Sequence, residues 1–358
     1  MIYYEQKPKK SLGFIIICLF LIVIIYILVN LINKIDYNMV NISKEETSEV
    51  TSFSSNEINV ENLIENSMYS IVGVSKIKEK NTSSFSNNSE NILGMGSGIV
   101  ISQDGYILTN RQTTGGLYST CYINLTNGEN YTGEVIWEDE VLDIAILKTN
   151  AIRLPNMTFA NTEECSLGER IYLLSNYTGY EIQKKVEEGI ISKINDTFKM
   201  QIDNENIYVE DVIRIDIEAN VNNTGGAVIN ENGELIGIVS EKNNAVIPIS
   251  RIKNVIEKIL EEGECEKIDL GIYGFDNEII NYINNDINLD HGVYIEKIDK
   301  DSLLKGLIDE GEIITRVDGI EVSRMSEIKE YAYKKNVGET LIISVIRDNV
   351  EKDIEIAL

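Results

Sequence analysis

Residues 220–240 (NVNNTGGAVINENGELIGIVS) are the stretch that decides how the first half of this chain is expected to fold. Thr224 stands directly before two glycines, and two short apolar runs follow, joined by the polar turn NENGE. Apolar, β-branched runs on both sides of a turn rich in Asn and Gly predict a β-hairpin. A hydroxyl side chain at the start of that hairpin makes Thr224 the first candidate for a chemically functional residue.

Short strand-like runs of the same kind continue on both sides of this stretch, from about residue 63 to residue 250. They include GSGIVIS, GYILTN, STCYINLTN, YTGEVIWE, DIAILKT, ERIYLLS, EEGIISKI and AVIPI. Strands at this spacing without helices between them predict an all-β barrel or sandwich. The glycines of GMGSG (94–98) precede a β run and not a helix, and no Gly-Lys-Ser/Thr follows, so a phosphate-binding loop is excluded.

Composition narrows the class of function. The 358 residues are 43% hydrophobic, enough for two domains with cores, and the formal charge is −26. Nucleic-acid affinity depends on Lys and Arg contacts to phosphates, so nucleic acid is not an expected partner. Cys121, Cys165 and Cys265 are widely spaced, with no C-x-x-C and no acidic calcium loop in the chain, so we expect no metal and no cofactor. The sequence does not exclude a single disulfide bridge between two of these cysteines.

The N-terminal segment predicts a membrane anchor. Residues 12–29 (LGFIIICLFLIVIIYILV) carry no charge, and 18 residues at about 1.5 Å each come close to spanning a bilayer core of roughly 30 Å. A cleavable signal peptide usually has a shorter apolar run that ends in small residues, which favours an uncleaved helix. Lys7, Lys9 and Lys10 precede it, so the positive-inside rule places the N-terminus in the cytoplasm and the rest outside. We therefore expect a cytoplasmic tail (1–10), a transmembrane helix (11–33), a flexible linker (34–62) rich in Ser, Thr, Glu and Asn, and a single-pass protein of the cell membrane.

Three segments carry a family resemblance. GSGIVISQDGYILTN (96–110), DEVLDIAILK (139–148) and residues 220–240, followed by AVIPIS, resemble in order and spacing the HtrA branch of the trypsin-like serine proteases. The resemblance implies a double β-barrel of two six-stranded barrels over residues 63–262. It also implies a His–Asp–Ser triad in that chain order.

The triad is degenerate at two of its three positions. The family's TN-x-HV places the histidine at Gln112, D-x-A-x-L-K places the aspartate at Asp143, and GNSGG places the serine at Thr224. Asn222 and Asn223 occupy the oxyanion loop, with Asn222 in place of a glycine whose N–H helps to bind the oxyanion. A neutral amide cannot take the proton of a hydroxyl nucleophile as an imidazole does.

Other routes to catalysis lack sequence support. The single histidine, His291, lies far along the chain in LDHGVYIE, where we expect a turn before a strand. An internal threonine has no terminal amine to act as its base. A Thr–Lys dyad with Lys242 remains open, although no motif indicates it. Because a buried carboxylate needs a partner, we hypothesise that the side chain of Gln112 donates a hydrogen bond to Asp143.

The C-terminal part resembles a PDZ domain of the HtrA type. Residues 251–262 have a 3.6-residue apolar stripe that predicts a helix stopped by Gly263, and the domain is expected over 263–358. Residues 306–322 (GLIDEGEIITRVDGIEV) carry the most specific match, and a helix at 326–335 and strands at 340–348 and 351–358 complete it. The resemblance implies that Leu270, Gly271 and Ile272 form the loop that binds a peptide carboxylate.

The sequence thus predicts a mostly β protein: a transmembrane helix, a trypsin-like double β-barrel and an α+β PDZ domain. The expected function is a non-catalytic, extracytoplasmic HtrA-like protease homologue that binds peptides or unfolded protein segments in envelope quality control or regulation. The family also implies assembly, as a homotrimer or with an active homologue. The alternatives are an active serine-type endopeptidase with an atypical site centred on Thr224, and a structural envelope protein that binds no peptide.

Overall fold

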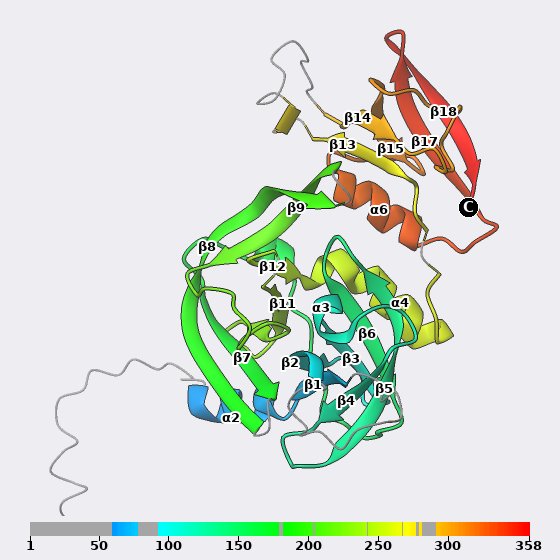
Figure 1. Ribbon diagram of the computed structural model, residues 1–358. Coiled ribbons are helices and arrows are strands. Elements are labelled where there is room, and N and C mark those ends of the chain that lie inside the picture. The colour runs from blue at the N-terminus through cyan, green and yellow to red at the C-terminus, as the bar shows by residue number, and fades with distance from the viewer. Residues whose placement is uncertain are drawn as a thin grey trace, which may run out of the picture. The chain divides into compact units, whose positions relative to one another are not determined.

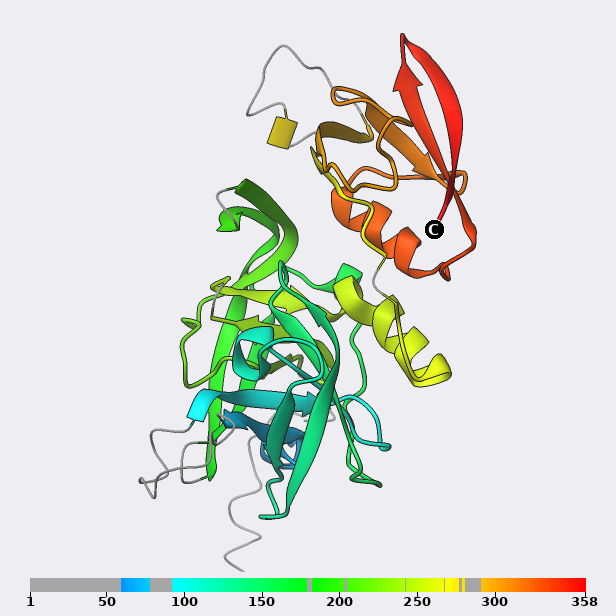
Figure 2. The same ribbon diagram turned by 45° about the vertical axis from the view of Figure 1, so that its right-hand side comes forward.

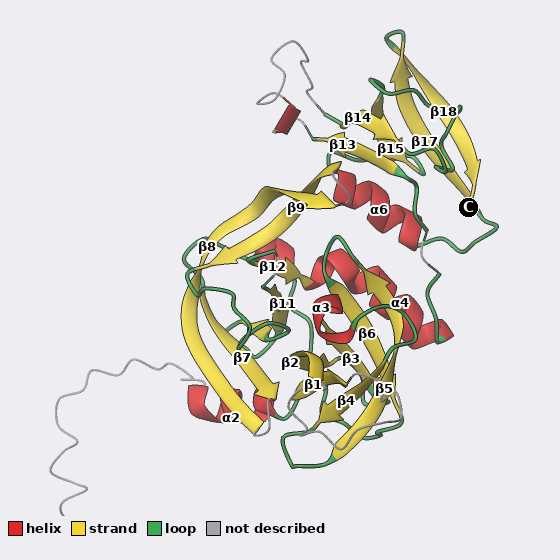
Figure 3. Ribbon diagram, viewed as in Figure 1, coloured by secondary structure: helices red, strands yellow, loops and turns green. Residues whose placement is uncertain are grey.

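The computed structural model describes residues 59–77, 92–178, 182–202, 205–241, 243–266, 268–276, 279–280 and 291–358. Across these ranges, no helix has both the length and the apolar character to cross a bilayer. The expected transmembrane helix (11–33), the polar segment 78–91 and Lys242 lie outside the described residues. Strands dominate the described chain (Figure 3), as the sequence predicts.

The first six strands close into a barrel (Figure 1). They are β1 (Ile71–Ile77), β2 (Ile92–Val100), β3 (Tyr106–Thr109), β4 (Thr120–Asn124), β5 (Asn130–Asp139) and β6 (Ile144–Thr149), in the order β1-β2-β3-β6-β5-β4. Closure comes from β1 pairing antiparallel with β4, in the register Val74 opposite Ile123. Buried and exposed residues alternate along β4 and β5, since successive side chains of a strand point to opposite faces.

A short helix leads into this barrel and another interrupts it. Helix α2 (Val60–Met68) precedes β1 and begins at Asn59, whose side chain accepts the N–H of Asn62. Its first residues fall in the segment that the sequence suggested as linker, because a single Asn cap and a short amphipathic run are easily missed. Helix α3 (Arg111–Thr114) follows β3 directly and carries the first part of the candidate site.

The next six strands form a second closed barrel. They are β7 (Arg170–Thr178), β8 (Ile182–Ile202), β9 (Glu205–Ile215), β10 (Ala227–Ile229), β11 (Leu235–Ser240) and β12 (Ala245–Pro248), in the order β10-β11-β12-β9-β8-β7. The short 3-10 turn η2 (Thr162–Glu164) precedes them. Figures 1 and 2 show β8 and β9, in green, as a long curved pair of antiparallel strands. The hairpin predicted for 220–240 is present as β10 and β11, which pair antiparallel.

Each barrel has its own apolar interior. Val72, Ile107 and Leu147 are fully buried in the first, and Ile171, Val228 and Ile236 in the second. A further cluster joins residues from both barrels with η3 (Ile249–Ile252) and α4 (Lys253–Glu262). Helix α4 ends at Gly263 in the left-handed conformation, with φ 87°, as the sequence predicts.

The C-terminal region is a sheet packed against one helix (Figure 3). Its strands are β13 (Ile272–Phe275), β14 (Val293–Ile298), β15 (Ile313–Val317), β17 (Thr340–Arg347) and β18 (Val350–Ala357), in that order, with β16 (Ile320–Glu321) paired to β15. Helix α6 (Met325–Tyr333) supplies Ile328 and Ala332 to the core of this sheet. The predicted helix and the two last strands are thus confirmed.

Candidate functional site

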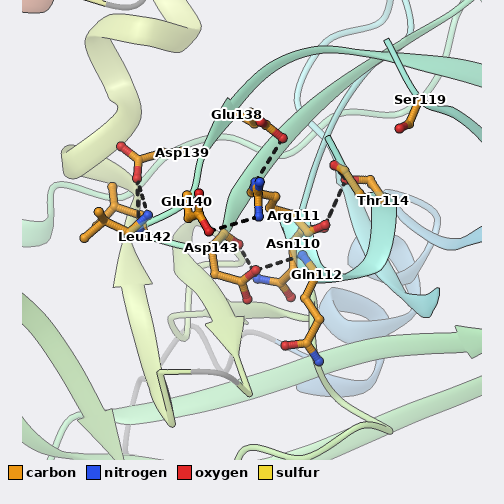
Figure 4. Close-up of polar contacts among 12 residues, drawn as sticks. Asn110, Arg111, Gln112, Thr114, Ser119, Glu138, Asp139, Glu140, Leu142 and Asp143 are labelled. Atoms are coloured by element: carbon orange, nitrogen blue, oxygen red, sulfur yellow. Dashed lines mark hydrogen bonds and ion pairs between the residues drawn. The ribbon is translucent and has the colours of Figure 1, made fainter. Parts of the chain in front are cut away.

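The candidate catalytic positions converge from four elements. Asn110 and Gln112 lie at the start of α3, Asp143 lies in the turn between β5 and β6, and Thr224 ends the loop before β10. Ser240, at the end of β11, completes the group. Asp143 has a left-handed backbone, with φ 57°, and its side chain is only 2% exposed. Figure 4 shows the part of the site built by α3 and the β5–β6 turn.

The Thr224 hydroxyl is already hydrogen-bonded inside the protein. Its Oγ1 donates to Oδ1 of Asn110 over 2.8 Å, and Nδ2 of Asn110 donates to the main-chain oxygen of Asp143 over 3.0 Å. Asn110 is fully buried, and Thr224 is 3% exposed. An amide oxygen accepts a hydrogen bond but has no useful basicity, so this contact fixes the hydroxyl without activating it.

The carboxylate of Asp143 has donors other than the expected one. Oδ1 accepts the main-chain N–H of Gln112 at 2.8 Å, and Oδ2 accepts the Ser240 hydroxyl at 2.9 Å. The Gln112 side chain extends away from Asp143 (Figure 4), with Nε2 3.5 Å from the Glu241 carboxylate, and it is exposed. The hypothesis of a side-chain bond from Gln112 is therefore wrong: position 112 serves Asp143 through its backbone.

Ion pairs hold the start of α3 against the neighbouring strand. Arg111 Nε lies 3.1 Å from Glu138 and Nη1 lies 3.5 Å from Glu140. The main-chain N–H of Arg111 donates to the Asp143 oxygen at 3.2 Å. These contacts fix the backbone that presents the amide of Gln112 to Asp143 (Figure 4).

The oxyanion loop is closed on itself. The N–H of Thr224 donates to the main-chain oxygen of Asn220 at 2.9 Å, and the N–H of Asn222 donates to the Asn220 side chain at 3.0 Å. The N–H of Asn223 also donates to the main-chain oxygen of Asn220. The fully buried Asn223 side chain donates to the carboxylate of Glu187 and to the main-chain oxygen of Glu218. Oxyanion stabilisation requires donors aimed at the developing charge, and these donors are already occupied.

Two glycines allow the loop to pack this closely on β2. Gly225 has φ 74°, and a Cβ there would lie 2.1 Å from the main-chain oxygen of Ser97. A Cβ on Gly96 would lie 2.6 Å from the hydroxyl of Thr113. The Thr224 carbonyl accepts the Ser97 N–H at 2.9 Å. The glycines around Thr224 therefore serve close backbone packing.

The described chain offers no ready substitute for the missing base or nucleophile near Thr224. His291 is exposed and lies in the bend before β14, as expected. Cys121, Cys165 and Cys265 are all free, and burial raises the pKa of the Cys121 thiol to about 11. Burial also raises the pKa of Cys165 to about 11, so both thiols stay protonated at neutral pH. Within the described ranges, no group of three or more His, Cys, Asp or Glu is arranged to hold a metal ion.

The carboxylate loop of the C-terminal domain precedes an open sheet edge. Leu270 and Ile272 are each 3% exposed, and Gly271 has φ 61°. Strand β13 is the last strand of its sheet and pairs only with β14 among the described strands. No described strand occupies its other edge, where an extended peptide can add as a strand. The N–H of Gly271 is not free, because it donates to the Asp269 carboxylate at 3.0 Å.

A cavity lies beside this loop. It measures about 660 Å³, and its wall includes Asp269, Gly271, Ser302 and Lys305. The Ser302 hydroxyl donates to the main-chain oxygen of Leu270 at 2.6 Å, which fixes the loop. Of the three predicted binding residues, Gly271 is the one on the wall of this cavity.

Asn110, Asn220 and Ser240 are the site residues that sequence reasoning missed. Asn110 stands in the TN that precedes Gln112, and Asn220 stands four residues before Thr224. Asn110 is a weak signal, because its partners Thr224 and Asp143 lie far along the chain. The bonds of Asn220 are local, and the asparagine of a turn that accepts the N–H two residues on is a signal that the sequence offered.

Comparison with known proteins agrees with this architecture. Residues 96–238 match the family model of the trypsin-like peptidase domain, and residues 269–358 match that of the PDZ domain. A Serine protease HtrA-like of Staphylococcus aureus (strain MRSA252) is 25% identical over 74% of this chain and 37% of its own length. The Serine protease Do-like HtrB of Bacillus subtilis (strain 168) is 27% identical over 73% of this chain and 61% of its own length. This chain therefore spans only part of these relatives.

Solved structures share the fold. The HtrA-type protease AlgW with a tripeptide superposes with a TM-score of 0.61 at 21% identity, over 84% of this chain and 96% of that chain. A serine endoprotease from Yersinia pestis gives 0.55 at 21% identity, over 86% and 98% of the two chains. At this level of identity the likeness concerns the fold alone.

Proposed function

Because the chain is an HtrA-type protease homologue, with a trypsin-like peptidase domain followed by a PDZ domain, we propose that it binds peptides without cleaving them. The observation that carries the proposal is the bond from the Thr224 hydroxyl to Asn110, a group that cannot take its proton. Fold alone does not make an enzyme, since the residues of the site decide.

The oxyanion loop supports the same conclusion independently. Even if the Thr224 hydroxyl were activated, the oxyanion formed by its attack would find the main-chain N–H groups of Asn222 and Thr224 already bound to Asn220. Removing one oxyanion donor alone costs about 10²–10³ in kcat in a serine protease. The site thus lacks a base and an available oxyanion hole together.

The PDZ domain supplies the binding activity in this proposal. An extended peptide adds as a strand along the open edge of β13, and its terminal carboxylate reaches the loop at Gly271. The ligand class is a peptide or an unfolded protein segment with a free C-terminus. Assembly with an active homologue belongs to the same proposal, because a non-catalytic binding module acts on proteolysis only through an active partner. Assembly as a homotrimer belongs to it as what the family resemblance implies.

We also propose that residues 11–33 anchor the protein in the cell membrane, with the N-terminus cytoplasmic and both domains outside. The support is the uncharged apolar run and the lysines before it. Labelling of a cysteine introduced at the exposed position 156 (Asn156→Cys), on intact and on lysed cells, tests the topology, because the protonated thiol of Cys165 reacts poorly. A membrane-impermeant thiol reagent should modify the introduced cysteine in unbroken cells whose outer layers are permeable to the reagent.

Cleavage of unfolded casein tests the absence of catalysis. The wild-type chain is compared with Thr224→Ala, with a triple variant (Gln112→His, Asn222→Gly, Thr224→Ser) and with the triple variant that also carries Asn220→Ala. We expect no cleavage by the wild type. Cleavage by either restored variant would assign the inertness to these positions. Cleavage by the wild type that Thr224→Ala abolishes would overturn the proposal and favour the atypical endopeptidase.

A further inference from the structure

Glu210, in the middle of β9, is a buried carboxylate at the contact between the second barrel and helix α6. It is 4% exposed, and its Oε2 accepts the N–H of Met325, the first residue of α6, at 3.2 Å. Its Oε1 is buried and has no hydrogen-bond partner among the described residues. The catalytic and peptide-binding positions described above make no use of this residue.

Further contacts fasten the same helix to the barrels. Next to Glu210, Asp211 pairs with Arg324 at 3.0 Å and accepts the hydroxyl of Ser326. At the other end of α6, the ring of Tyr333 meets the ring of Trp137 edge to face, with centroids 6.3 Å apart. Trp137 comes from β5 and is 2% exposed. One end of α6 is therefore held by carboxylates and the other by an aromatic contact.

Helix α4 contacts the second half of α6 and the residues after it. Asn254 of α4 donates to Glu330 at 2.9 Å, and the ammonium group of Lys258 donates to the main-chain oxygen of Lys335, beyond the end of α6, at 2.5 Å. These contacts hold α6 and the residues after it to α4 without involving Glu210.

Four charged side chains, from four different segments of the chain, interact electrostatically with Glu210. They are Asp211 on β9, Arg251 on η3, Asp276 after β13 and Lys329 on α6. Burial is the main cause that raises the pKa of Glu210 to about 7, and the carboxylates of Asp276 and Asp211 add to it. Arg251 and the Met325 N–H act in the opposite direction. Arg251 also donates to the main-chain oxygen of Glu210, so its charge is partly committed there.

We propose that Glu210 is a proton-dependent latch that holds the PDZ helix α6 on the second barrel when protonated and loosens it when ionised. The docked state buries the carboxyl group, whereas the undocked state exposes it to water, so docking takes up a proton. A carboxyl whose pKa is raised by docking favours the docked state below its ordinary pKa of 4.5. That preference is lost as pH rises through about 7. Between these two pKa values the docking constant falls by up to tenfold per pH unit, and above about pH 7 it levels off.

The fluorescence of Trp137 can report whether α6 is docked. Trp137 is the only tryptophan of the chain, and it touches α6 through Tyr333. When α6 loosens, the indole meets water, and its emission shifts to the red. Emission and acrylamide quenching of the full chain in detergent, measured from about pH 4 to pH 9, therefore follow docking directly. We expect a blue, protected indole at low pH and at least twofold stronger quenching at high pH, with the change falling between pH 4.5 and about 7.

Four variants test the assignment. Glu210→Gln stays blue at every pH, because its amide does not ionise. Asp276→Asn removes a neighbouring charge and moves the midpoint to lower pH; it also covers the case in which Glu210→Gln fails to fold. Glu134→Gln, an exposed strand residue, titrates like the wild type. His291→Asn does so too, which separates the effect from the only histidine. A flat wild-type profile, a transition that survives in folded Glu210→Gln, or one lost in His291→Asn would each overturn the latch.

Discussion

The Thr224 hydroxyl donates to the amide oxygen of Asn110 at 2.8 Å, where a hydrolase would need a base. The same amide donates to the main-chain oxygen of Asp143, so one buried side chain links the loop before β10 to the turn between β5 and β6. The two barrels are thus joined at the degenerate site by a structural contact. Two predictions follow from this contact and its neighbours, and two more from the PDZ domain.

Replacing Asn110 by alanine should destabilise the barrels. The change leaves the Thr224 hydroxyl, which is 3% exposed, without its acceptor, and an unsatisfied buried polar group costs about 1–3 kcal/mol. Urea unfolding measures the loss. Asn156→Ala, at an exposed position, is the matched control and should change stability by less than about 0.5 kcal/mol. Equal effects of the two substitutions would contradict the bridging role.

Gln112 and Ser240 should differ sharply when each is changed to alanine. Gln112→Ala keeps the main-chain N–H that Asp143 accepts, so we expect a change within about 0.5 kcal/mol. Ser240→Ala removes the hydroxyl on Oδ2 of a buried carboxylate, at a cost of about 1.5–3 kcal/mol. Both values come from the same denaturation assay. A large loss in Gln112→Ala would restore the side-chain hypothesis.

Asp269→Ala should strengthen peptide binding by the PDZ domain. The substitution frees the N–H of Gly271 and removes a negative charge beside the incoming carboxylate. We expect about five- to tenfold tighter binding, the equivalent of one released donor. Fluorescence anisotropy with C-terminal peptides measures the affinity, and amidated peptides should show no gain. Asp301→Ala, on the wall of the same cavity, controls for charge alone; an equal gain there would reject the Gly271 contact.

The pair Glu312–Arg347 should make the PDZ sheet sensitive to acid. The hydrogen bond from Arg347 lowers the pKa of Glu312, against the effect of burial, below its ordinary value of 4.5. A carboxyl with a lowered pKa in the folded state stabilises the fold above that ordinary value, and the contribution disappears as pH falls through the lowered pKa.

Hydrogen exchange of the β15 amides gives the readout for this pair. Arg347→Met should reduce protection at pH 7, and its difference from the wild type should shrink as pH falls below 4.5. Arg316→Met breaks a more exposed pair with Glu351 and serves as the control. A difference for Arg347→Met that stays constant with pH would show that the carboxyl has no shifted pKa.

Much of the fold could be predicted from the sequence, because strand patterning and turn residues are local. The hairpin after Thr224, helix α4 with its Gly263 stop and the last two strands follow from periodicity and turn chemistry. Closure of the barrels was implied by resemblance, since the pairing of β1 with β4 joins strands far apart along the chain.

The site was only partly predictable. The positions of Gln112, Asp143 and Thr224 came from motif spacing, and they do lie in neighbouring segments. The direction of the Gln112 side chain did not follow, because α3 turns it outward to Glu241 while its N–H faces Asp143. The role of Asn110 depends on its rotamer and on contacts to Thr224 and Asp143, which no local pattern encodes.

The Asn220 turn has a consequence for how such a protein can change over time. A single back-substitution to histidine at position 112 would place a base near a hydroxyl that is bound elsewhere, beside amides that Asn220 already holds. Under the proposed function, restoring cleavage therefore takes more than one substitution, because Asn110 would still hold the hydroxyl and Asn220 would still hold the amides.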